Sequence, residues 1–185
     1  VKNEVDKAVN DCGSEELSCV KEKVKNSYTL KDIETDSKTL EKMIREELTN
    51  LAKEYDITYV HPRGKRVEVK GKNITVGLFF IYGEYAYIGL VKLMNNQEVD
   101  SETQLLPFIN VIEHDKKEYK VAKRFVITNG KISLEGVDSV ELSTLEVVRM
   151  IRGDTVILEE KVRGLLKIIL LSQKESNVTN SEVVT

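Results

Sequence analysis

The chain of 185 residues carries 28 Lys and Arg against 31 Asp and Glu, a formal net charge of −3. Because 41% of its residues are hydrophobic and 32% are charged, it can form one sizeable core and is not disordered as a whole. The charge balance excludes a uniformly basic nucleic-acid binder. Two His and two Cys leave few candidate ligands for a zinc site or catalytic triad.

Residues 1–56 are predicted to be a helical segment that packs on a sheet. The clearest helix lies between Leu40 and Tyr55, where apolar residues recur at helical spacing with Glu and Lys on the other face. Either Asp36 or Ser37 could cap this helix.

Several features of the ends of the chain favour secretion. Cys12 and Cys19 are the only cysteines, and their short spacing predicts one local disulfide; two free thiols in a cytoplasmic protein are the alternative. The sequence starts at Val1 instead of Met, as expected if a leader was removed or the chain was trimmed. Glycosylation sequons at Asn73 and Asn177 matter only if the protein is secreted.

From Ile57 on, the apolar period changes to two or to continuous runs, which predicts a mainly antiparallel β domain over 57–172 and a polar tail over 173–185. Turns are expected at Gly83-Glu84, Asn129-Gly130 and Gly153-Asp154. The fold class is α+β, with N-terminal helices followed by a β-sandwich or a strongly bent sheet. The expected strands are 66–70, 74–82, 85–94, 105–112, 119–128, 132–134, 145–151, 155–162 and 165–171.

Residues 73–91 are nearly uncharged and about as long as a membrane span. Glu84 lies at the centre of this stretch, where a charge is costly in a bilayer. A hairpin with Glu84 at its tip fits better, so no transmembrane span is expected.

A basic run at 61–72 is the one clear charge cluster. It could hold phosphate or nucleic acid, with Tyr55 and Tyr59 upstream as stacking partners; a solvated hairpin loop is the simpler interpretation. The candidate anion ligands are Arg63, Lys65, Arg66, Lys70 and Lys72.

Asp32, Glu34 and Asp36 resemble the first half of a calcium loop, but Ser37 and Met43 stand where an EF-hand needs Gly and Glu. A looser calcium site remains, and carboxylates near a helix N-terminus are the alternative.

Glu113-His114-Asp115 places a histidine between two carboxylates, as a general base would require. Neighbours in an extended chain point to opposite faces, so a polar turn between strands is the simpler interpretation.

The leading hypothesis is a non-enzymatic, extracellular binding or self-assembling structural protein. Its partners would be copies of itself or another protein, held through apolar strands or terminal segments, and no cofactor is expected. The alternative is a nucleic-acid- or anion-binding module that uses the 61–72 loop, in the cytoplasm or elsewhere. The third hypothesis is an enzyme that uses the Glu113–Asp115 region.

Overall fold

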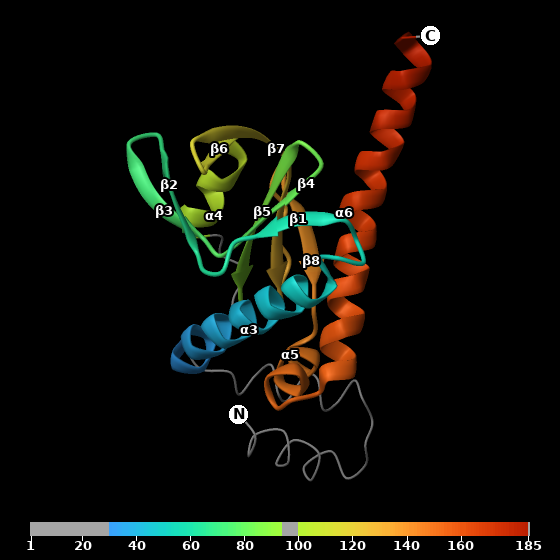
Figure 1. Ribbon diagram of the computed structural model, residues 1–185. Helices are drawn as coiled ribbons and strands as arrows, with labels where there is room; N and C mark the ends of the chain where they lie inside the picture. The colour runs from blue at the N-terminus through green and yellow to red at the C-terminus, as the bar shows by residue number, and fades with distance from the viewer. Residues whose placement is uncertain (1–29, 94–99, 185) are drawn as a thin grey trace.

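The protein has an α+β fold in a computed structural model that describes residues 30–93 and 100–184 (Figure 1). Helix α3 comes first, then most of the strands, and two helices end the described chain. The elements are α3 (Leu30–Leu51), β1 (Ile57–Val60), β2 (Lys65–Val69), β3 (Lys72–Val76), β4 (Leu78–Tyr82), β5 (Tyr85–Lys92), α4 (Ser101–Leu105), η1 (Leu106–Phe108), β6 (Val111–His114), β7 (Lys117–Thr128), β8 (Asp138–Glu141), α5 (Thr144–Ile151) and α6 (Thr155–Val184).

The main sheet has the strand order β1-β4-β5-β7-β6, and β8 pairs with the second half of β7. The pairs β5–β7 and β7–β8 are parallel, whereas β1–β4, β4–β5 and β6–β7 are antiparallel. Strands β2 and β3 form a separate antiparallel hairpin. The predicted α+β class is confirmed, but its sandwich alternative is not: one mixed sheet has helices on one face and the two-stranded β2–β3 hairpin on the other.

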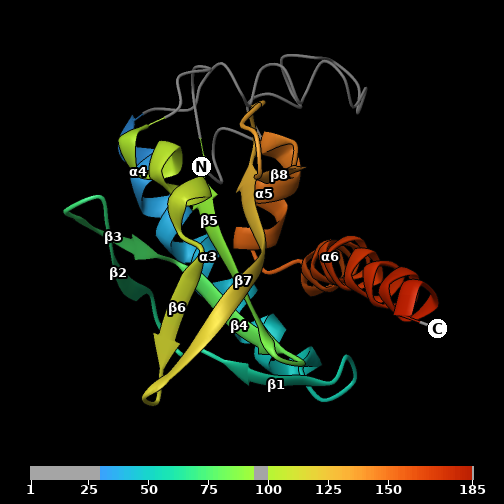
Figure 2. The same cartoon turned by 90° about the horizontal axis from the view of Figure 1, so that it is seen from above.

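Strands β4 and β5 are buried on both faces. Leu78 and Phe80 belong to the core beneath α3, α5 and α6, whereas Phe79 and Ile81 belong to the core beneath the β2–β3 hairpin and η1. Figures 1 and 2 show the helices on one side of the sheet and the hairpin on the other. This explains why these strands read as continuous apolar runs instead of alternating ones.

Helix α3 confirms the predicted N-terminal helix. Leu40, Ile44 and Leu48 are buried at helical spacing and face the sheet. Asp36 and Ser37 lie inside α3, so the expected cap at either residue is wrong.

The predicted β4–β5 hairpin is confirmed, with Gly83 at φ 63° and Glu84 exposed in its turn. The expected single strand over 74–82 is broken at Gly77, where an added Cβ would overlap the Glu41 side chain. Among the described residues, no helix is both long and apolar enough to cross a membrane.

The strands expected over 145–151, 155–162 and 165–171 are wrong, because these residues form α5 and α6. Ser143 and Glu146 form a reciprocal capping box that starts α5. The Asp154 side chain accepts a hydrogen bond from the Ile157 backbone N–H at 3.2 Å, which caps α6. Helix α6 continues into the residues expected as a polar tail, as far as Val184.

The hairpin predicted at Asn129-Gly130 is also absent from the described residues. The Asn129 amide is buried and donates to Thr144 Oγ1 at 2.9 Å, and the next strand runs parallel to β7 instead of folding back. Most of the strand expected over 105–112 is replaced by η1 and loop.

The sheet is strongly bent, as predicted. Strands β1 and β6 are opposite ends of the strand order, yet the Tyr59 and His114 rings stack with centroids 4.0 Å apart. The two edges therefore curl toward each other over the face that the β2–β3 hairpin covers.

The prediction of a secreted, disulfide-bonded, glycosylated and self-assembling protein is not supported by the structure. Cys12 and Cys19 lie outside the described residues, and the described part of the chain forms no disulfide. It also gives no sign of secretion, glycosylation or self-assembly.

Two glycine substitutions should have opposite effects on stability. In Gly89→Ala the new methyl group meets the Phe125 ring, whereas in Gly164→Ala it meets nothing within 4 Å. We expect Gly89→Ala to lower the free energy of unfolding by about 2 kcal/mol through overpacking. Gly164→Ala should raise it by about 0.5–1 kcal/mol, because alanine favours helix.

Urea unfolding of both variants measures this difference. Equal stability of Gly89→Ala and the wild-type protein would contradict the close packing of β5 on β7.

Candidate functional site

The two histidines of the chain lie together, although 53 positions separate them in sequence. Tyr59 lies on β1, His61 follows that strand, Phe79 lies on β4 and His114 ends β6. Their rings form what we term the histidine–tyrosine cluster. The His61 and His114 centroids are 6.3 Å apart, and the Phe79 ring lies within 6 Å of the other three rings.

A short hydrogen bond of 2.6 Å joins the Tyr59 hydroxyl to Nδ1 of His61. Burial raises the pKa of Tyr59 against the opposing effect of Arg63, and burial lowers the pKa of His61. Both groups are therefore neutral near pH 7, which assigns the phenol as donor and places the imidazole proton on Nε2.

Positive charges surround His61. After burial, the charges of Lys65, His114, Arg63 and Arg45 also lower its pKa. Arg45 is occupied, since it donates to the Gly77 carbonyl at 2.8 Å and pairs with Glu41 at 3.3 Å. Arg63 and Lys65 have no ion pair within the described residues, so their charges can act on a ligand.

A groove of about 430 Å³ runs between β2 and β6, beside the histidine–tyrosine cluster. Neither strand is paired on the side that faces the groove, as far as the described residues go. Outside the residues that line the groove, the Lys70 ammonium after β2 lies 3.4 Å above the ring centroid of Phe108, which precedes β6. The groove is lined by Lys65, Arg66, Val67, Glu68, Val111, Ile112, Glu113 and Asp115, and its charge is therefore mixed.

The structure divides the basic residues predicted from the sequence. Arg63 and Lys65 lie beside His61, and Arg66 lines the groove. Lys70 and Lys72 lie at the other end of β2, at the turn to β3. The basic run is thus an elongated surface with one end at the histidines.

The other predicted site residues do not assemble into a site. Asp32, Glu34 and Asp36 lie within α3, and no cluster of three metal-binding side chains is found where the structure describes residues. Asn73 is exposed on β3. Asn177 lies on α6, and its side chain is not among those that the structure describes.

Glu113 and Asp115 do not converge on His114. Glu113 is exposed on β6, whose neighbouring side chains point to opposite faces, and Asp115 lies in the β6–β7 turn. The polar turn expected at this position is confirmed, with φ of 52° at Asp115 and 64° at Lys116. The partners of His114 come from β1 and β4 instead.

A second charged cluster lies at the end of β5. Lys92 is 2.9 Å from Asp100 and 3.0 Å from Glu102. Burial favours the neutral amine, but the two carboxylates outweigh it and raise the pKa of Lys92. Asp100 also caps α4 by accepting from the Thr103 N–H at 2.8 Å. Since these charges satisfy one another, the cluster anchors α4 to the sheet.

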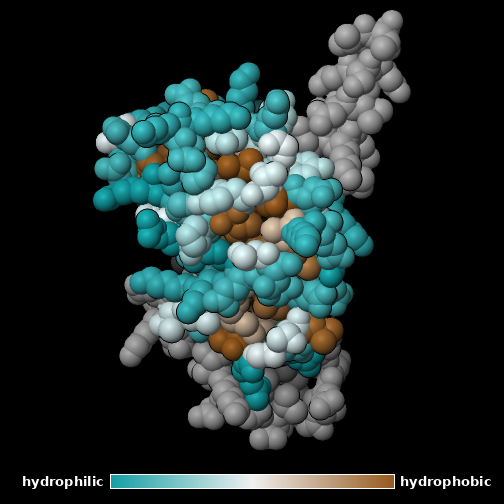
Figure 3. Space-filling view, in the orientation of Figure 1, coloured by the Kyte–Doolittle hydropathy of each residue, from teal (hydrophilic) through white to brown (hydrophobic). Residues whose placement is uncertain are grey.

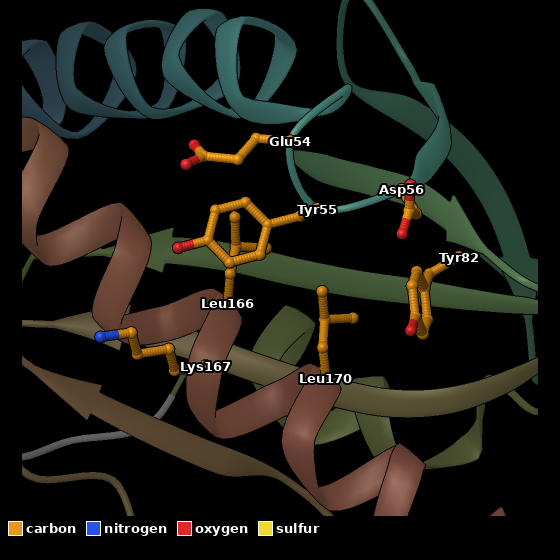
Figure 4. A pocket seen from close by; sticks show the side chains of 7 residues that line it. All are labelled: Glu54, Tyr55, Asp56, Tyr82, Leu166, Lys167 and Leu170. Carbon is orange, nitrogen blue, oxygen red and sulfur yellow. The ribbon is translucent and has the colours of Figure 1, made fainter.

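A separate pocket of about 390 Å³ opens on the helix side of the sheet (Figure 4). It lies between the end of α3, the end of β4 and α6. Tyr55, considered from the sequence as a stacking partner of the basic run, lines this pocket and not the groove. The space-filling view shows a mainly hydrophilic surface broken by small hydrophobic patches (Figure 3). The lining residues are Glu54, Tyr55, Asp56, Tyr82, Leu166, Lys167 and Leu170.

Comparisons with protein-family models, curated proteins and solved structures each give no match to this chain. The chemistry of the sites is therefore interpreted from their geometry.

The pKa of His61 predicts how stability depends on pH. Because the folded protein lowers this pKa, the unfolded chain takes up the proton first as the pH falls. Stability that is present above the ordinary histidine pKa is lost as the pH decreases from about 7.5 to about 5. His61→Gln should lose less stability over the same range.

Thermal unfolding at a series of pH values measures both slopes. Parallel stability curves for wild type and His61→Gln would contradict the lowered pKa.

Proposed function

We propose that the protein is an anion-binding module that holds phosphate groups of a short single-stranded nucleic acid. The observation behind this proposal is the convergence of both histidines with Tyr59, next to the free cations of Arg63 and Lys65. A phosphate would accept from the guanidinium of Arg63, the ammonium of Lys65 and Nε2–H of His61.

Aromatic surface near these donors supports a ligand with bases. Tyr59 and His61 are half-buried, and Phe108, which precedes β6 and contacts Lys70, is 50% exposed. Base stacking on aromatic rings is sequence-tolerant, and basic side chains along the same surface would follow the backbone of the ligand.

The acidic residues of the groove limit the size of the ligand. Glu68, Glu113 and Asp115 face the same space as Lys65 and Arg66. A long polyanion would meet these carboxylates, so we propose contacts to a few phosphates only, and a shallow dependence of affinity on salt.

Binding without catalysis is proposed for the same site. General acid–base chemistry at His114 would use the flanking carboxylates, yet Glu113 points away from it and Asp115 is in the turn.

Charge reversal at Arg63 tests the binding proposal. We expect Arg63→Glu to weaken binding of a fluorescein-labelled eight-nucleotide RNA or DNA by about tenfold or more. The matched control is Lys131→Glu, an exposed lysine beyond the opposite end of β7 with the same change of charge. Fluorescence anisotropy at several salt concentrations measures the affinities. Equal loss in both variants, or no binding by the wild-type protein, would overturn the proposal.

Proton linkage gives a second test. A bound phosphate stabilises the protonated form of His61, so the affinity should rise as the pH falls from about 8 to about 6. In His61→Gln this increase should disappear. A wild-type affinity that is independent of pH would contradict an ionic contact between protonated His61 and the phosphate.

A further inference from the structure

The geometry of the pocket between α3, β4 and α6 points to a second binding site, and we propose that it takes a small organic cation with a flat apolar body. Its volume of about 390 Å³ is in the range of small-ligand pockets, roughly 300–1,000 Å³. It lies on the helix side of the sheet, so this inference is independent of the proposed nucleic-acid site.

The pocket has an apolar floor and two aromatic walls. Leu166 and Leu170 of α6 are 0% and 5% exposed and form the floor. Figure 4 shows Tyr55, Tyr82 and Leu170 arranged around a common space. A flat hydrocarbon ring would therefore contact tyrosine and leucine side chains on several sides.

Both tyrosines are held in place by their neighbours. The Tyr55 hydroxyl accepts from Arg163 at 3.4 Å, and Arg163 also pairs with Glu54 at 2.8 Å. The Tyr82 ring packs edge-to-face on the buried Tyr87 ring, with centroids 6.2 Å apart. The walls are thus ordered before a ligand binds, which reduces the entropic cost of binding.

The charges at the rim select a cation. Glu54 pairs with Arg163, which also pairs with Glu159, whereas Asp56 has no ion pair within the described residues. In Figure 4 Asp56 lies above Tyr82, whereas Lys167 is on the far side of Tyr55 and points away. An ammonium group would fit between the Asp56 carboxylate and the face of an aromatic ring, where cation–π attraction adds to the ion pair.

The backbone of Asp56 fixes the position of its carboxylate in the turn before β1. Its φ of 59° is left-handed, a conformation that glycine adopts with less strain. The turn is fixed by the Ile57 N–H, which donates to the Ala52 carbonyl at 2.8 Å. Aspartate here places a carboxylate at the pocket, which glycine would not.

Tryptamine and two matched analogues test the proposal. Tryptophol replaces the ammonium by a hydroxyl, and indole-3-propionate replaces it by a carboxylate. The chain contains no Trp, so the indole fluorescence of the ligand reports binding without a protein background from that residue. We expect tryptamine to bind at least about tenfold more tightly than tryptophol, and indole-3-propionate to bind most weakly.

Variants test the roles of the Asp56 carboxylate and the Tyr82 ring. Asp56→Asn and Asp56→Gly should both remove the preference for tryptamine over tryptophol, and the glycine variant fits the left-handed turn, so misfolding would not explain its loss. Tyr82→Leu should weaken both ligands. Glu84→Gln is the control, because it removes an exposed carboxylate two residues from Tyr82 in the β4–β5 turn.

Three results would each overturn the proposal. They are no binding of tryptamine at millimolar concentration, equal binding of tryptophol, and tightest binding of indole-3-propionate, which would make Lys167 the selecting charge.

Discussion

The burial of both faces of β4 and β5 is the constraint on which the rest of the structure depends. Leu78, Phe80 and Tyr87 need a cover on one side, and Phe79 and Ile88 need another on the other side. Helices α3, α5 and α6 form the first cover, which brings the C-terminal helix beside the N-terminal one. The second cover is only the short β2–β3 hairpin with η1, and the sheet curls over it.

This curl produces the histidine–tyrosine cluster. A flat sheet would hold β1 and β6 at opposite edges, three strands apart, but here Tyr59 stacks on His114. The same bend brings β2 close to β6 and leaves a groove between two unpaired strand edges. The candidate binding surface is therefore a consequence of how the smaller core is covered.

Local sequence signals correctly predicted the elements whose apolar residues follow one clear spacing or are bounded by a clear turn. Helix α3 and the β4–β5 hairpin are examples, since Leu40, Ile44 and Leu48 mark one helical face and Gly83 marks a tight turn. The buried residues of α5 also recur at helical spacing, as Leu145 with Val148 and Val147 with Met150 show. The run is short and contains two adjacent valines, so it was interpreted as a strand. The capping box of Ser143 and Glu146 was the signal that could have decided it.

Long-range packing overrode two strong local signals. Asn129-Gly130 favours a two-residue hairpin, but the Asn129 amide bonds to Thr144 instead. Gly153-Asp154 also looks like a hairpin turn, and the structure uses both residues between helices, with Gly153 at φ 106° after α5 and Asp154 as the cap of α6. The same residue types serve either purpose, so their spacing alone does not distinguish a hairpin from a helix junction.

The sequence predicted only the basic residues of the candidate site. The basic run identified Arg63 and Lys65, but nothing in the spacing connects His61 to His114, because their contact depends on the curl of the whole sheet. The pocket beside Asp56 was not visible at all, since α6 was interpreted as strands.

Strand β1 connects the two proposed sites. Asp56 precedes it and His61 follows it. Among the described strands it pairs with β4 alone, with an irregular register after Ile57. An edge strand of four residues held by one ladder is easier to displace than the central strands. A ligand bound at either end would restrain the same short segment. The two sites differ in chemistry and lie on opposite faces of the sheet, yet both depend on the position of this strand.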